Sequence, residues 1–162
     1  MSLEEASKME VRSLRSILSY QFGYEAAKLI KGEVEVKRSR STGRIREVYL
    51  DGILIGVIRA GDGFFVPSLE GAARLLRYLP PPRVRVIVPT DVAVYVARGR
   101  SVFCKHVLDA GPEIRPMDEV IVVDEDDNLV AVGKALLAGP AMKLFSHGRA
   151  VKVRKGTRKG RS

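Results

Sequence analysis

Apolar and polar residues alternate with two different periodicities along this chain, and the first periodicity covers residues 5–30. Apolar side chains recur there every three or four residues, which is the spacing of one face of a helix. The residues of this stripe are Val11, Leu14, Ile17, Leu18, Phe22, Ala26, Leu29 and Ile30. Gly23 interrupts the stripe and Gly32 follows its end, so we expect a helical region that is split at Gly23 and stops near Gly32.

After residue 30 the apolar residues recur with a period of two, which predicts short strands. Apolar residues alternate with charged or turn-forming residues over 34–36, 45–50, 53–60, 64–66 and 83–88, and Asp51-Gly52 is a strong hairpin signal. Ser68 is placed to cap a helix that ends at Leu79, where three consecutive prolines stop it. These elements predict a small mixed α/β domain over residues 1–90.

The remaining chain is rich in predicted strands. Residues 91–98 fit a short connecting helix, residues 101–107 a strand, and residues 120–123 and 129–137 two strands around an acidic turn. After a compact segment at 139–148, residues 149–154 alternate apolar and basic side chains. We therefore expect a second, β-rich domain over residues 91–156, a basic tail at 157–162, and an α+β class for the whole chain.

The charge of the chain favours an anionic partner. Its formal net charge is +9, and residues 149–162 contain seven Lys or Arg and no Asp or Glu. Nucleic acid is favoured over a membrane surface, because no apolar run approaches the ~20 residues that a spanning helix needs. The N-terminus has no signal-peptide pattern and there is one cysteine, so we expect a cytoplasmic protein.

Catalytic and metal-binding residues are not indicated by the sequence. Cys104, His106 and His147 are too few for a structural zinc site, and Cys104 is better explained as a buried strand residue than as a nucleophile. The acidic turn 124–128 begins like a calcium loop but has Leu129 where the required glycine should stand. We expect no catalytic residue, metal or cofactor, and keep open a small base-modifying enzyme with an unrecognised site.

Three stretches of the second half resemble a PUA domain, the small β-barrel shared by pseudouridine synthases and archaeosine transglycosylases. They read SVFCKHVLDAGPEIRPMDEVIVVDEDD, LVAVGKALLAG and GRAVKVRKG, from about Ser101 to Gly156. Upstream, RSLRSILSYQFGYEAA and the segment from VKRSRSTGRIREVYLDG to LPPPRVRV resemble the domain that precedes PUA in archaeal tRNA-guanine transglycosylase. The resemblance implies a PUA-like β-barrel over 91–156. It does not extend to that enzyme's catalytic barrel or its zinc site.

The PUA resemblance also implies an RNA groove with two walls. One wall would include Lys105, His106, Gly111 and Arg115, and the other would include Gly148, Arg149, Lys152, Arg154 and Lys155, with Lys134 extending the groove. The two glycines would let RNA approach the backbone closely. Many family members have glycine where this chain has Met117, which argues against such an approach at that turn.

A second basic segment lies in the first half. Lys37, Arg38, Arg40, Arg44 and Arg46 form a ten-residue window without an acid, which fits either a solvated hairpin rim or a secondary RNA contact. Exposed aromatic residues are not expected in a row: Tyr20, Phe22 and Tyr24 are predicted to be core or interface residues. This favours structured RNA over an extended single strand.

Together these features predict a non-catalytic protein that binds structured RNA. The resemblance implies tRNA, held by its acceptor stem and CCA end, and a separate catalytic transglycosylase chain as partner in an archaeosine-type modification system. The alternative is a free-standing RNA-binding module in ribosome assembly or translation. A protein-interaction adaptor, whose charge serves only solubility, is a third possibility.

Overall fold

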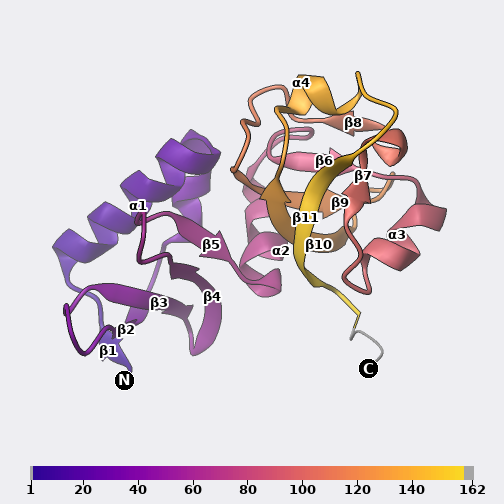
Figure 1. Ribbon diagram of the computed structural model, residues 1–162. Coiled ribbons are helices and arrows are strands. Elements are labelled where there is room, and N and C mark those ends of the chain that lie inside the picture. Colours follow the sequence, from indigo (N-terminus) through magenta and orange to yellow (C-terminus); the bar gives the residue numbers. More distant parts are fainter. Residues whose placement is uncertain (1, 159–162) are drawn as a thin grey trace. The chain divides into compact units, whose positions relative to one another are not determined.

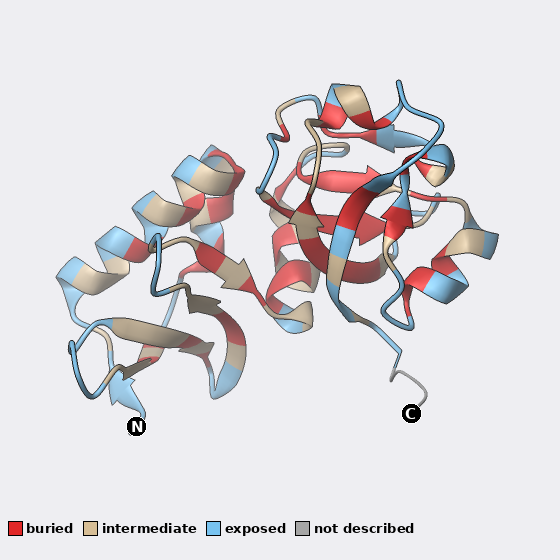
Figure 2. Ribbon diagram, in the orientation of Figure 1, coloured by how far each residue is buried: buried red, intermediate tan, exposed pale blue. Residues whose placement is uncertain are grey.

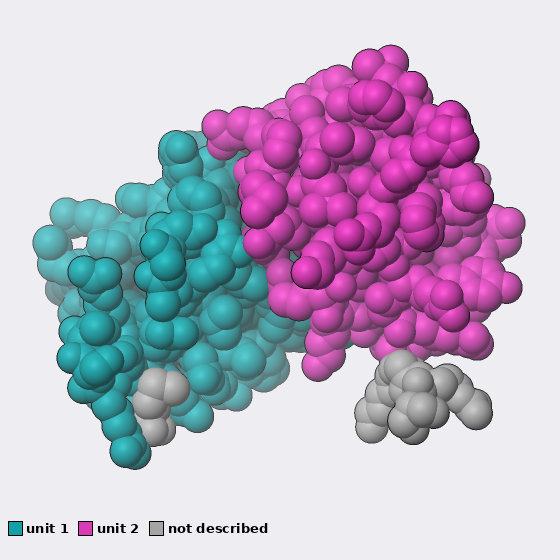
Figure 3. Space-filling view, viewed as in Figure 1, with its two compact units in different colours: residues 1–79 teal, residues 80–162 magenta. Residues whose placement is uncertain are grey.

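The computed structural model describes residues 2–158, and these residues form two compact units (Figure 1). The first unit spans Met1–Leu79 and the second spans Pro80–Ser162 (Figure 3). Each has its own sheet, which confirms the predicted mixed α and β class. No helix in the described part of the chain is long and apolar enough to cross a membrane.

The first unit is a five-stranded antiparallel sheet with two α-helices and a 3-10 helix. Its strands pair in chain order, β1-β2-β3-β4-β5. Their bounds are Glu4–Glu5, Val34–Arg38, Ile45–Leu50, Ile53–Ile58 and Phe65–Pro67. Helix α1 contacts β5, and α2 contacts β4. The helices are α1 (Lys8–Phe22), the 3-10 helix η1 (Tyr24–Leu29) and α2 (Leu69–Tyr78).

Local sequence signals account for most boundaries in this unit. Helix α1 ends at Gly23, whose φ of 112° few other residues adopt, and η1 begins at the next residue, so the predicted split is confirmed. The Ser68 hydroxyl accepts a hydrogen bond from the Gly71 N–H and caps α2. The Asp51-Gly52 turn joins β3 and β4, with φ of 50° and 78° as a tight hairpin requires.

The second unit is a six-stranded curled sheet with strand order β7-β11-β10-β9-β6-β8. The strands are β6 (Arg85–Ile87), β7 (Val102–Phe103), β8 (Asp109–Ala110), β9 (Glu119–Val123), β10 (Leu129–Ala135) and β11 (Arg149–Gly156). Helices α3 (Thr90–Val96) and α4 (Gly139–Met142) and the 3-10 turn η2 (Cys104–His106) complete it. Because η2 and two further residues link edge strands β7 and β8, the sheet must curl until its edges approach.

The core of the second unit lies inside this curl. Strand β9 is buried along its whole length, and β10 nearly so (Figure 2). Val86, Val120, Val122 and Val151 are at most 1% exposed and belong to one cluster. Met142 of α4 joins the same cluster, so this short helix helps to close the barrel-like core.

Three expectations about the second domain need correction. The unit begins at Pro80 rather than residue 91, because β6 pairs with β9 and β8 instead of with the first sheet. Residues 104–106 form a 3-10 turn rather than a continuing strand. Thr157 and Arg158 are hydrogen-bonded to Val130 and Ala97, so they belong to the folded unit rather than to a tail. Residues 159–162 of the predicted tail lie outside the described residues.

Candidate RNA-binding surface

Strand β11 carries most of the cations that the sequence predicts to bind RNA. In Figure 1 it crosses the front of the second unit and runs toward the C-terminus. Arg149, Lys152, Arg154 and Lys155 are all exposed, whereas Ala150 and Val151 between them are fully buried. The buried residues fasten the strand to the core, and this fixes the backbone positions of the exposed cations.

Two lysines stand directly opposite each other in the middle of this surface. Lys134 on β10 pairs in register with Lys152 on β11. Residues opposite each other share one face of a sheet, with Cβ atoms about 5 Å apart, and like charges in that position destabilise the fold. Glu119 on β9 stands opposite Lys134 on its other side. We call Lys134, Lys152 and Arg154 the strand cluster.

Arg154 is held by an acidic partner within the fold. Its Nη1 donates a hydrogen bond to Oε1 of Glu119 at 2.5 Å, and the Glu119 side chain is only 1% exposed. A buried carboxylate needs a compensating charge, so Arg154 has a structural role that the sequence did not reveal. The Arg154 side chain remains 38% exposed, which leaves part of it accessible to a ligand.

A second group of polar side chains lies at the start of β11, and we call it the turn cluster: Lys105, His106 and Arg149. The Cys104 N–H donates to the Gly148 carbonyl at 2.9 Å, and Phe103 stands opposite Arg149 in the β7–β11 register. These contacts bring η2 against the first residues of β11. Gly148 is exposed with a φ of 89°, as expected for a residue whose backbone is accessible at this bend.

The loop that carries Arg115 reaches the end of β10. The Met117 N–H donates to the Ala135 carbonyl, and the Ala135 N–H donates to the Asp118 carbonyl. Arg115 is 64% exposed and its Nε lies 3.9 Å from the Asp118 carboxylate. The structure therefore places the loop that carries Arg115 beside Ala135, the residue that follows Lys134.

Gly111 does not match its expected role. It is buried, its N–H donates to the Arg85 carbonyl, and a Cβ on Gly139 would lie 2.0 Å from its carbonyl oxygen. The close approach that glycine permits here is between the loop after β8 and the start of α4. This is a packing reason for glycine and disagrees with our expectation of an RNA contact at Gly111.

Cys104 is buried as expected, although in η2 rather than in a strand. Its side chain is 2% exposed, and burial raises the pKa of the thiol, which keeps it in the unreactive form.

Within residues 2–158 there is no group of three or more His, Cys, Asp or Glu arranged to hold a metal ion. The acidic turn at 124–128 instead bonds to itself: hydrogen bonds from Asn128 and Asp126 outweigh burial and lower the pKa of Asp124.

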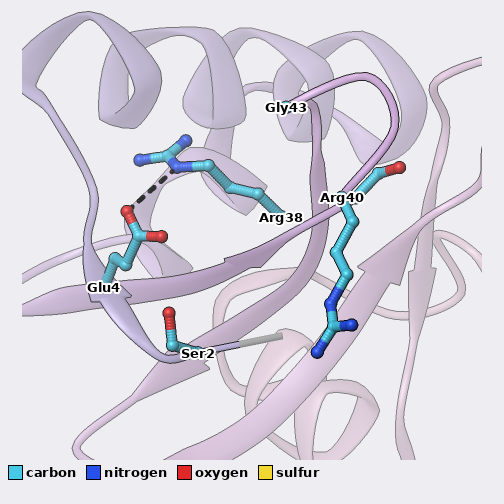
Figure 4. Close-up of a pocket in the computed structure, with 6 residues that line it drawn as sticks. Ser2, Glu4, Arg38, Arg40 and Gly43 are labelled. Carbon is cyan, nitrogen blue, oxygen red and sulfur yellow. Dashed lines mark hydrogen bonds and ion pairs between the residues drawn. The ribbon is translucent and has the colours of Figure 1, made fainter.

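The predicted secondary contact lies on the hairpin between β2 and β3. Arg38 pairs with Glu10 and with Glu4, so its charge is already balanced within the fold. Figure 4 shows Arg38 reaching toward Glu4, whereas Arg40 extends away from this pair. Arg40 and Arg44 are exposed, and neither has an ion-pair partner among the described residues. They are the better candidates for a phosphate contact.

The remaining two hairpin cations are half-buried. Lys37 lies 5.4 Å from the centre of the Tyr49 ring, and Arg46 lines a shallow depression with Arg40 and Glu47. The Tyr49 hydroxyl donates to Glu47 at 2.5 Å, and this bond raises the pKa of Tyr49. These contacts hold Lys37 and Arg46 along the sheet rather than at the hairpin tip.

Sequence reasoning missed several exposed apolar and aromatic residues. Leu144 and Phe145 follow α4 and are 80% and 52% exposed, and Phe103 beside the turn cluster is 44% exposed. Tyr20 and Tyr24, which we expected to be buried, are 68% and 80% exposed. A signal was present for Leu144-Phe145, because this apolar pair lies between the polar residues Lys143 and Ser146.

Family comparisons agree with this division of the chain. Residues 12–82 match the patch-forming domain C2 of tRNA-guanine transglycosylase, and residues 84–157 match the PUA domain. The chain is a PUA-domain protein that resembles the C-terminal part of archaeal tRNA-guanine transglycosylase.

Two curated relatives show how far the likeness extends. The tRNA-guanine(15) transglycosylase of Pyrococcus abyssi is 47% identical over 147 residues, covering 90% of this chain and 25% of the relative. The enzyme of the same name from Thermococcus onnurineus is 42% identical over 159 residues, covering 98% and 27%. The PUA-domain protein thus spans about a quarter of the length of these relatives.

Solved structures share the fold across the whole chain. A hypothetical protein from Pyrococcus horikoshii OT3 has a TM-score of 0.78 and 27% identity, covering 98% of this chain and 96% of its own. A conserved PUA-domain protein from Thermoplasma acidophilum has a TM-score of 0.72 at 22% identity, covering 96% and 93%. Both chains are accounted for almost completely by the same pair of domains.

Proposed function

We propose that this PUA-domain protein binds the acceptor stem and CCA end of tRNA in the cytoplasm and so presents the tRNA to a transglycosylase catalytic domain. The observation that carries the proposal is the juxtaposition of Lys134 and Lys152 on adjoining strands. A like-charge pair directly opposite costs stability in the free protein. A bound phosphate offsets that cost, and the strand cluster is fixed on a rigid sheet that would hold it in place.

The arrangement favours recognition of shape over recognition of sequence. The strand cluster, the turn cluster and Arg115 supply ammonium, guanidinium and imidazole groups, which bind phosphate oxygens without reading bases. Lys155 and the exposed backbone at Gly148 extend the same surface. Such a surface suits a structured RNA whose backbone runs along β11.

The chemistry would come from a separate catalytic domain. The relatives are named as transglycosylases, and this chain matches about a quarter of each. The proposed role is therefore to bind and position the RNA, in partnership with a separate catalytic transglycosylase chain. Purification of the protein with its associated proteins should recover a tRNA-modifying chain, and addition of the protein should stimulate base exchange by that chain.

The binding proposal is tested by measuring affinity for tRNA, for CCA-truncated tRNA and for an unrelated RNA duplex across a salt series. We expect tRNA to bind most tightly and removal of CCA to weaken it. The Arg149→Ala/Lys152→Ala variant should bind more weakly and lower the slope of log affinity against log salt by about 1.8, or ~0.9 for each lost phosphate contact. The side chains are exposed and Lys152→Ala removes a like-charge pair, so its melting temperature should equal or slightly exceed that of the parent.

A matched control removes the same charge elsewhere. Lys8 and Arg12 are exposed on α1 and lie outside every surface proposed here, so Lys8→Ala/Arg12→Ala should leave the salt slope close to that of the parent. An equal loss in both double variants would show that only net charge matters. Equal affinity for tRNA and the unrelated duplex would contradict tRNA recognition, and weak binding insensitive to salt would point to a protein-interaction adaptor.

A free-standing RNA-binding module in ribosome assembly or translation is the second candidate. It is favoured by the Pyrococcus horikoshii chain, 96% of which is covered by the same two domains. The two functions differ in their partners. Recovery of the protein with ribosomal particles, and not with a modification enzyme, would support the second.

A further inference from the structure

A pocket in the first unit collects cations and tyrosines from three helical elements. Its lining includes Arg15 of α1, Tyr24 and Lys28 of η1, Lys31 just after η1, and Tyr78 at the end of α2. No acidic residue lines this pocket. Among residues 2–158, none of the three cations has a carboxylate within ion-pair distance. Their charges are therefore available to an anion.

The two tyrosines are presented in different ways. Tyr24 is 80% exposed, so a large aromatic ring faces solvent at the mouth of the pocket. Tyr78 is half-buried, and the Lys31 ammonium lies 5.4 Å from the centre of its ring. This cation–π contact holds Lys31 over the pocket. Arg15 is held too, because its Nε donates to the Ile30 carbonyl at 2.8 Å.

We propose that this pocket, which we call the tyrosine pocket, binds one unstacked nucleotide of an RNA. Its base would stack on the Tyr24 ring, and its phosphates would lie against Lys28 and Lys31. The inference rests on the proposed function in that it assigns the first unit to the same kind of ligand. The tyrosine pocket differs from the β11 surface in its location and in how it would bind RNA, because an aromatic ring and cations act together in the pocket.

The chemistry of the lining favours a nucleotide over a simple anion. Bases stack on aromatic side chains whatever their sequence, and each stack contributes a large share of the affinity of single-stranded RNA. An inorganic anion would use the cations but would gain nothing from an exposed tyrosine ring. A duplex keeps its bases stacked on one another, so the nucleotide must come from a loop, a bulge or an end.

The absence of tryptophan from the sequence allows a direct test. Tyr24→Trp introduces a single tryptophan at the mouth of the pocket, and Tyr20→Trp introduces one at another exposed tyrosine that does not line it. The probes are a short single-stranded oligouridylate, a blunt RNA duplex and UMP. We expect the oligouridylate to quench the fluorescence of Tyr24→Trp, with little change in Tyr20→Trp and little effect of the duplex.

Affinity measurements supply the second readout. Tyr24→Ala should weaken binding of the oligouridylate about tenfold, whereas Tyr20→Ala should not. Lys28→Ala/Lys31→Ala should lower the salt slope for the oligouridylate by about 1.4, the value for two lost contacts to a single strand. Because these side chains are solvent-exposed or at the pocket rim, melting temperatures of the variants check that folding is intact.

Each other outcome overturns the inference. Equal quenching in both tryptophan variants would show non-specific contact, and no quenching would show that no base stacks at Tyr24. UMP acting as strongly as the oligouridylate would identify a free nucleotide, not RNA, as the ligand. The proposed tRNA function fails separately, since it depends on Arg149 and Lys152, and neither residue lies in this pocket.

Discussion

At the scale of single residues, Met117 has a backbone conformation that is unusual for a residue with a side chain. Met117 has a φ of 76°, in the left-handed region that glycine adopts freely and other residues adopt at a cost. The turn precedes β9 and lies beside Lys134, so its geometry bears directly on the candidate RNA surface.

Replacing Met117 by glycine should stabilise the protein. The left-handed conformation costs about 1–2 kcal/mol for a residue with a Cβ. Glycine loses part of that gain, about 0.5–1 kcal/mol, through its greater freedom in the unfolded chain. We expect Met117→Gly to raise the free energy of unfolding in urea by about 0.5–1 kcal/mol. Met117→Ala, which keeps a Cβ, is the control and should give no such gain.

At the scale of elements, ion pairs fasten helices and turns to the sheets. Glu10 of α1 is bound by Arg38 of β2, and this contact, strengthened by hydrogen bonds from Ser7, lowers the pKa of Glu10 to about 2. In the second unit, Arg85 of β6 donates two hydrogen bonds to Asp127 in the turn between β9 and β10. Each pair joins segments that are distant in sequence.

The Glu10 contact should make stability depend on pH in the acid range. Its pKa in the folded protein lies below the ordinary value of 4.5, so the unfolded state binds a proton first as pH falls. The stabilisation is therefore complete above about pH 4.5 and is lost as pH falls toward 2. Glu10→Gln keeps the side-chain cap at Ser7 but not the charge, and should flatten urea-unfolding stability across this window.

If Glu10→Gln does not flatten the dependence of stability on pH, Glu10 is not the group responsible for it. Asp62, whose pKa is also lowered through its hydrogen bonds with Arg59, titrates in an overlapping range. Asp62→Asn is therefore the comparison variant. If Glu10→Gln and the parent lose stability in parallel between pH 4.5 and 2, the Arg38 contact does not carry the effect.

The Arg85–Asp127 pair should contribute strongly, because the Arg85 side chain is only 1% exposed. Asp127 has a φ of 62°, which asparagine also tolerates, so Asp127→Asn removes the charge without straining the turn. Breaking a buried pair costs about 3–5 kcal/mol, and the 41% exposure of Asp127 reduces this, so we expect a loss of about 2 kcal/mol.

Denaturant unfolding measures this loss, and the neighbouring position gives the control. Asp126 is exposed in the same turn and has no ion pair among the described residues, so Asp126→Asn should change stability little. Equal effects of the two substitutions would assign the loss to the turn in general. A selective loss at Asp127 would assign it to the contact with β6.

At the scale of the whole molecule, both units carry basic side chains on the surfaces proposed to bind RNA. The second unit has the strand cluster and the turn cluster, and the first has the hairpin residues Arg40 and Arg44 besides the tyrosine pocket. An RNA large enough to reach both units would lose counterions at each of them. The total salt dependence of binding therefore counts the phosphate contacts of both units together.

The hairpin contribution is measurable by itself. Arg40→Ala/Arg44→Ala removes two exposed guanidinium groups and should lower the salt slope for tRNA by about 1.8 if both contact phosphate. Combining it with Arg149→Ala/Lys152→Ala should give additive losses, because the two pairs share no partners. An unchanged slope would leave the hairpin as a solvated rim, the simpler interpretation of this charged segment.

The sequence by itself determined the features that depend on near neighbours. The split at Gly23, the cap at Ser68 and the Asp51-Gly52 hairpin were predicted because each is specified within a few residues. The basic character of residues 149–155 and the PUA resemblance were also evident from the sequence. These signals located the candidate RNA-binding surface approximately, without showing which of its cations pair with acidic residues elsewhere in the fold.

Only the tertiary structure decided the features that depend on distant segments. Strand β6 joined the second sheet through parallel pairing with β9, about 35 residues further along, and local pattern does not encode such a pairing. The carboxylate of Glu119 pairs with Arg154, and the backbone of Gly111 packs closely against Gly139. Residues of α1, η1 and α2 converge to line the tyrosine pocket. Which charges remain for a ligand is settled by long-range contacts, because a charge is available only where folding leaves it without a partner.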